Sequence, residues 1–213
     1  SITEVTGGRF LMAAWIPIRG WGGNLVIREL VQLPDGRIGS KWMQEIVPDT
    51  EKAKTLAANV TQTAMYDADS KSFMLVFKVQ SAEARKGRAG ITFLAESGEQ
   101  ASCELQIQLG DQRAQFGAGS LSNFAENEKS LREGGAPQQV GNYAIENLLA
   151  VDKPFTVRII VKGCEKIGGT LIDAEIAGHR TMMSYRPELT VKKILFRMEG
   201  VELSNVRFES LKT

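Results

Sequence analysis

The sequence predicts an all-β protein, a two-sheet antiparallel β-sandwich of the jelly-roll type with about twelve strands. Apolar and polar residues alternate over short segments, most clearly at 73–79 and at 155–161. Turn residues such as Pro34-Asp35-Gly36 separate these segments, and no stretch keeps the periodicity of a long helix. Two packed sheets are the simplest solution, because each alternating strand needs a facing sheet to bury its apolar side.

The first strong element is a β-hairpin near the start of the chain. Residues 25–33 are rich in apolar and β-branched side chains, 34–36 form a turn, and 37–46 can return as the second strand. Glycines on both sides of Trp21 let the chain bend sharply just before this hairpin. The stretch therefore predicts a corner between two structural units.

The rest of the chain continues the sandwich pattern. Residues 48–59 are charged and alanine-rich, which predicts a connector with one or two helical turns. Residues 119–142 hold no periodicity and predict a long loop, for which a crossover between the two sheets is the expected role. Further strands are predicted at 60–66, 73–79, 91–95, 101–109, 113–118, 155–162, 170–176, 191–198 and 205–211.

Composition excludes several classes of protein. The chain has 213 residues, of which 43% are hydrophobic and 24% are charged, so a single domain with a full core is expected. The formal net charge of +1 disfavours nucleic acid as a partner. No apolar run is long enough to span a membrane, and the first residues lack the form of a signal peptide. If the chain is a fragment, a signal for secretion or for the periplasm would lie upstream of Ser1.

Neither a cofactor nor a metal site is predicted. His179 is the only histidine, which excludes a histidine-clustered zinc site, and a histidine exposed in a turn is the expected role. The glycine-rich segments match no phosphate-binding or dinucleotide-binding motif. Cys103 alternates with apolar residues, so we expect a buried free thiol there. Cys164 lies in a predicted turn, and the sequence does not decide whether the two cysteines pair.

Asp173 and Glu175 are the sharpest local candidates for catalysis. They stand two residues apart on a predicted strand, so both carboxylates project from one face of a sheet. Paired carboxylates are what glycoside hydrolysis requires. Sandwich glycoside hydrolases of the laminarinase type carry a third acid before such a pair, and Leu171 occupies that position here.

Four motifs stand in order near the start of the chain: Gly8-Arg9 leading to Trp15, then Trp21-Gly22-Gly23, Arg28-Glu29-Leu30 and Asp35-Gly36-Arg37. They resemble the domain junction in glycoside hydrolase family 32, which includes invertases, levanases and inulinases. In that family a Gly-Arg strand closes a five-bladed catalytic propeller, and the next hairpin opens a concanavalin-like β-sandwich. The resemblance is specific over residues 7–46, although Ile27 stands where the family usually has proline.

This resemblance implies a domain division and a function. Residues 1–17 would be the terminal strand of a missing N-terminal propeller, and residues 18–213 would be the β-sandwich module. The catalytic acids of the family lie in three propeller motifs that do not occur in this chain, so the resemblance implies no catalytic residue here. In that setting Asp173 and Glu175 are structural. The module would stabilise a propeller that acts on fructose-containing saccharides, and that propeller would be its partner.

The three tryptophans Trp15, Trp21 and Trp42 all lie within or beside the junction hairpin, where Arg28 and Glu29 add polar groups. We expect these five residues to form a binding surface. Packing against the propeller is the favoured role, since aromatic side chains dominate buried interfaces. Stacking on carbohydrate rings is the other role, which would make the chain an independent carbohydrate-binding module. A sandwich glycoside hydrolase that uses Asp173 and Glu175 is the second alternative.

The segment Arg9–Ile16 is too apolar for a free tail. Its apolar residues follow one another without alternation, which predicts a strand covered on both faces. In the family that cover is the last propeller blade.

Overall fold

The computed structural model describes residues 1–15, 25–81, 83, 86–117, 144–148, 151–166 and 168–212. These residues form sixteen strands and one short 3₁₀ turn, and all pairings between strands are antiparallel. The predicted all-β sandwich is confirmed. Among the described residues no helix is long and apolar enough to cross a bilayer.

The strands are β1 (Ile2–Val5), β2 (Arg9–Trp15), β3 (Leu25–Gln32), β4 (Ile38–Trp42), β5 (Thr50–Val60), β6 (Ala64–Asp67), β7 (Ser72–Ser81), β8 (Arg88–Ala95), β9 (Gly98–Gln108), β10 (Arg113–Gly117), β11 (Ala144–Ile145), β12 (Phe155–Gly163), β13 (Thr170–Ile176), β14 (Arg180–Arg186), β15 (Lys193–Glu199) and β16 (Val201–Leu211), with the turn η1 (Gln44–Ile46) between β4 and β5.

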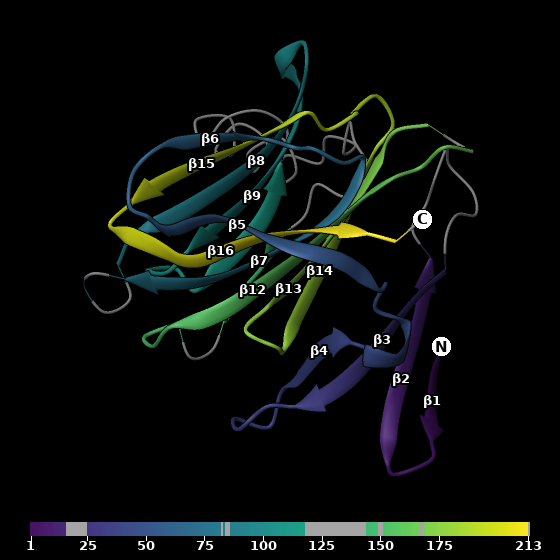
Figure 1. The fold of residues 1–213 in the computed structure, drawn as a ribbon. Coiled ribbons are helices and arrows are strands. Elements are labelled where there is room, and N and C mark those ends of the chain that lie inside the picture. The colour runs from purple at the N-terminus through teal and green to yellow at the C-terminus, as the bar shows by residue number, and fades with distance from the viewer. Residues whose placement is uncertain are drawn as a thin grey trace, which may run out of the picture.

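Three sheets result, and Figure 1 shows how they are arranged. The small sheet has the order β1-β2-β3-β4 and stands apart from the other two. The first sandwich sheet has the order β11-β10-β9-β8-β15-β6. The second has the order β14-β13-β12-β7-β16-β5. The two six-stranded sheets face each other and enclose the core.

Aromatic rings join the two sandwich sheets across that core. Phe73 of the second sheet stacks on Phe208 of the same sheet at 4.6 Å between ring centroids, and it also lies 6.4 Å from Phe93 of the first sheet. Phe77 meets Phe196 of the first sheet edge-on at 6.3 Å. The alternation predicted at 73–79 therefore places one face of β7 in the core between the sheets. The side chains on that face are at most 1% exposed, and they are Phe73, Leu75, Phe77 and Val79.

The predicted junction hairpin is confirmed as β3 and β4, joined by a turn in which Gly36 has a φ of 84°. That left-handed angle suits glycine, which has no Cβ to clash. The hairpin nevertheless pairs with β2 in the small sheet and adds to neither sandwich sheet. The expected domain boundary between residues 17 and 18 falls within 16–24, which are outside the described residues, so the division at that point stays a prediction.

Four strands were not predicted, namely β1, β5, β11 and β14. Residues 48–59 were expected to be a connector with helical turns, but most of them form β5, which pairs with β16 along its length. Alanine, lysine and glutamate favour helix in isolation, and cross-strand pairing overrides that preference here. Strand β14 was also missed, because its centre is Thr-Met-Met-Ser, without the usual β-branched alternation. The predicted loop 119–142 lies outside the described residues.

Cys103 has a free thiol and is fully buried, which confirms the expectation for this residue. Cys164 is also free and is partly buried. His179 does lie in the turn before β14, but it is half-buried rather than exposed, and its backbone carbonyl accepts a hydrogen bond from the small sheet.

Candidate functional site at the junction of the small sheet and the sandwich

A buried ion pair joins the small sheet to the second sandwich sheet. Arg28 on β3 directs its Nη2 atom at both carboxylate oxygens of Asp173 on β13, each at 2.7 Å. The two residues are 7% exposed each, so the charges face one another with little water between them. A pair of this kind is strongly coupled, because removing either partner leaves the other charge buried alone.

Trp42 extends this pair into a network. Its indole Nε1 donates to Asp173 at 3.1 Å, and its backbone N–H donates to the Oε2 atom of Glu175 at 2.6 Å. The side chain is 2% exposed and packs against Met74 and Ile160 of the second sandwich sheet. The end of β4 is therefore held by both acids of β13.

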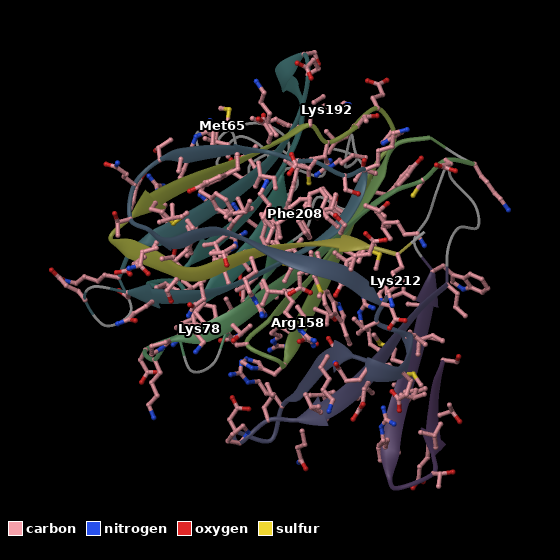
Figure 2. The ribbon with its side chains drawn as sticks, in the orientation of Figure 1. Met65, Lys78, Arg158, Lys192, Phe208 and Lys212 are labelled. Atoms are coloured by element: carbon pink, nitrogen blue, oxygen red, sulfur yellow. The ribbon has the colours of Figure 1, made fainter. Side chains whose placement is uncertain are left out.

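Arg158 on β12 completes the network from the sandwich side. Its Nε and Nη2 atoms donate to the Oε1 atom of Glu175 at 3.0 and 2.5 Å. Its guanidinium lies 4.8 Å from the centre of the Trp42 ring, which is a cation–π geometry. Figure 2 shows Arg158 on the side of the sandwich that faces the small sheet.

Burial raises the pKa of Asp173 to about 6, and the charge of Arg28 and the hydrogen bond from Trp42 act in the opposite direction. Both carboxylates are committed to partners in the network, and Glu175 is 4% exposed. The expectation that the two acids share a face is confirmed. The face on which they lie is the one that the small sheet covers.

A close backbone contact lies beside the network. The N–H of Ser40 on β4 donates to the carbonyl of His179 at 2.9 Å, and the hydroxyl groups of Ser40 and Thr181 lie 2.6 Å apart. A Cβ atom on Gly39 would lie 2.4 Å from that same carbonyl oxygen. Position 39 therefore requires glycine for the small sheet to approach β14 this closely.

Glu29 points to the opposite face of the small sheet, where it holds the sheet itself together. Arg9 of β2 contacts it at 2.6 Å, and Lys41 of β4 contacts it at 3.0 Å. Arg9 also pairs with Glu45 at 2.5 Å. These contacts lower the pKa of Glu29, chiefly through Arg9, and lower the pKa of Glu45 to about 2.

The tryptophans do not share one surface. Trp42 faces the sandwich, whereas Trp15 pairs with Leu25 on the other face of the small sheet and is 71% exposed. Trp21 lies outside the described residues. Of the five candidate binding residues, the structure brings Arg28 and Trp42 to the junction and leaves Glu29 and Trp15 on the opposite face.

Sequence reasoning missed Arg158, Ser40 and Gly39. Arg158 interrupts an apolar run on β12, which is the one signal that could have marked it as a buried-face cation. Ser40 and Gly39 carry no signal, since their importance comes from the approach of β14. Among the described residues, no group of three or more metal-ligating side chains is present.

The geometry defines an antiparallel β-sandwich with an additional four-stranded sheet docked on the outer face of one of its sheets. Comparison with solved structures agrees on this fold. No protein-family model matches the chain, and no curated protein sequence matches it.

Solved structures do match over nearly the whole chain. A glycoside hydrolase family 32 β-fructofuranosidase from Bombyx mori aligns with 100% of this chain at a TM-score of 0.63 and 10% identity. A fructofuranosidase from Schwanniomyces occidentalis in complex with fructose aligns with 100% of this chain at a TM-score of 0.62 and 11% identity. An exo-inulinase from Aspergillus awamori aligns with 98% of this chain at a TM-score of 0.59 and 8% identity.

At these identities the likeness establishes the fold. The matched region makes up 40%, 47% and 41% of those three chains, so this chain spans less than half their length. The fold is that of one part of a fructofuranosidase or inulinase.

Proposed function

We propose that this chain is the non-catalytic C-terminal β-sandwich module of a family 32-related glycoside hydrolase, and that it stabilises the catalytic propeller of an enzyme acting on fructose-containing saccharides. The observation that carries the proposal is the network of Arg28, Trp42 and Asp173. Arg28 belongs to the Arg-Glu-Leu motif on which the family resemblance rests, and its role in the structure is to dock one unit on another.

The small sheet supports this proposal and refines the domain division. Strands β1 to β4 are paired in chain order as an antiparallel meander, which is how a propeller blade is built. We place the whole small sheet with the propeller, so that the sandwich begins after Trp42 instead of near residue 18. Exposed apolar residues of the small sheet, such as Trp15, would then contact the rest of the propeller.

A catalytic role for Asp173 and Glu175 is disfavoured by their surroundings. Both carboxylates lie under the small sheet, and each accepts hydrogen bonds from two residues of the network. A retaining or inverting pair needs both groups open to one sugar ring. The paired acids therefore fit a structural role at the junction.

The experiment is a reducing-sugar assay of the isolated chain with sucrose, levan and inulin. We expect no hydrolysis, because the chain lacks the acids that the propeller would supply. Turnover that is abolished by Asp173→Asn would overturn the proposal and favour a sandwich hydrolase. The reading frame that precedes Ser1 gives a second test, since we expect it to encode Asn-Asp-Pro-Asn, which is one of the three propeller motifs that carry the catalytic acids of the family.

An independent carbohydrate-binding module is the second candidate, and the exposure of Trp15 is the observation in its favour. Calorimetry with fructo-oligosaccharides separates the two. A scaffold should give no binding heat at millimolar ligand, whereas saturable binding that is lost in Trp15→Ala would establish the carbohydrate-binding role.

A further inference from the structure

A groove of about 400 Å³ runs along the open side of the junction. It lies between β3, the segment from Trp42 to Pro48, and strands β12 to β14. Its walls are mainly apolar, and the residues that line it include Val26, Ile46, Ile160, Leu171 and Met183. The volume falls within the range of pockets that bind small molecules in proteins.

The polar groups of the groove are few and carry opposite charges. Arg28 and Asp173 line it, but they are bound to each other and so offer little net charge to a ligand. Lys162 also lines the groove, is exposed, and makes no ion pair with any described residue. Among the described residues that line it, the groove therefore combines apolar walls with one positive charge outside an ion pair.

We propose that this groove is a binding site for a small amphipathic anion, which places an apolar aliphatic or aromatic body between the walls and a carboxylate or sulfonate near Lys162. Burial of the apolar body supplies most of the affinity, and the charge of Lys162 sets the orientation. A neutral sugar does not fit, because its hydroxyl groups would lose hydrogen bonds to water against apolar walls. The site is separate from the proposed saccharide chemistry and does not depend on it.

Cys164 gives this proposal a direct reporter. Its side chain lines the groove, and burial raises the pKa of its thiol. The only other cysteine, Cys103, is fully buried in the sandwich core. A small neutral alkylating reagent at about pH 8.5 should therefore modify Cys164 in the folded chain and spare Cys103, which serves as an internal control for unfolding.

The probe is anilinonaphthalene sulfonate, and its matched neutral analogue is phenylnaphthylamine, which lacks the sulfonate. We expect the anion to slow alkylation of Cys164 by about tenfold at ten times its dissociation constant. The neutral analogue should protect Cys164 clearly less well at the same concentration. Protection should saturate, and Cys103 should stay unmodified throughout.

Two lysine variants test the charge. Lys162→Gln should weaken protection by the anion about three- to tenfold, which corresponds to the loss of one exposed charge contact. Lys78→Gln is the matched control, because Lys78 is exposed on β7 of the same sheet and does not line the groove, and it should behave as wild type. Absence of protection at millimolar anion, equal protection by the neutral analogue, or an unchanged Lys162→Gln variant would each overturn the proposal.

Discussion

The small sheet and the sandwich are both antiparallel, yet they are stabilised in different ways. In the sandwich, Phe77 and Phe93 are at most 1% exposed, because each sheet covers the other. In the small sheet, Phe10 is 48% exposed, and Trp42 is the one hydrophobic residue of β1 to β4 that is buried. The sandwich therefore depends on buried apolar area, and the small sheet depends on a few specific polar contacts.

Two adjacent residues show this dependence within the small sheet. Arg28 and Glu29 point to opposite faces, as neighbours on a strand must. Arg28 reaches Asp173 across the junction, while Glu29 holds Arg9 and Lys41 within the sheet. One residue docks the sheet and the next holds its strands together, so a single dipeptide carries both functions.

The largest difference between the two regions should appear when the same side chain is removed from each. We expect Phe77→Ala to lower the free energy of unfolding by about 3–5 kcal/mol, because it leaves a cavity in a closed core. Phe10→Ala should change it by less than about 1 kcal/mol, since its ring already contacts solvent. Urea unfolding followed by circular dichroism measures both. Equal losses would mean that the small sheet is covered as well as the sandwich.

The next largest effect should come from breaking the junction. We expect Arg28→Met to destabilise the docked small sheet by about 3 kcal/mol, because Asp173 is left as a buried carboxyl group without its cation. The control is Lys54→Met, which breaks the exposed pair with Asp69 and should cost less than about 1 kcal/mol. Hydrogen exchange of the Trp42 amide reports on docking. If the two substitutions accelerate that exchange equally, the ion pair does not hold the junction.

A smaller change in the free energy of unfolding should follow when the pH is varied. The pKa of Asp173 is about 6 in the folded chain against an ordinary value of 3.8, so the folded state binds this proton more tightly. The stabilisation that results is complete below about pH 3.8 and is lost as the pH rises through about 6. Between about pH 5 and about pH 7.5, wild type should therefore lose about 1 kcal/mol relative to Asp173→Asn. An NMR titration of the Asp173 carboxyl group with a midpoint below about 4 would contradict this.

The sequence predicted those elements whose pattern is local. The β3–β4 hairpin has its turn residues, and β7 and β12 alternate as strands with one buried face should. Strand β5 was misread because its Lys-Ala-Lys composition favours helix, and only its pairing with β16 makes it a strand. Information of that kind lies in the partner strand and cannot be read from the segment itself.

Only part of the candidate site could be predicted, because its contacts also join segments that are far apart in the sequence. Asp173 and Glu175 could be placed on one face from their spacing, and Arg28 could be singled out from its motif. That Arg28 and Asp173 are partners could not be predicted, because 145 positions separate them. Arg158 was missed because strand pairing sets it opposite Glu175 and docking of the small sheet brings Trp42 to it, and neither contact can be read from its own segment.

We infer that the small sheet is a separate unit, and that the Arg28 network holds it to a sandwich that is stable by itself. Native-state hydrogen exchange of the intact chain tests this most directly. We expect the amides of β2 and β3 to exchange together in a partial opening of lower free energy than that of β7 and β12, which should exchange only by global unfolding. Arg28→Met should lower the first value and leave the second unchanged. A single opening free energy for all four strands, lowered uniformly by Arg28→Met, would contradict the account.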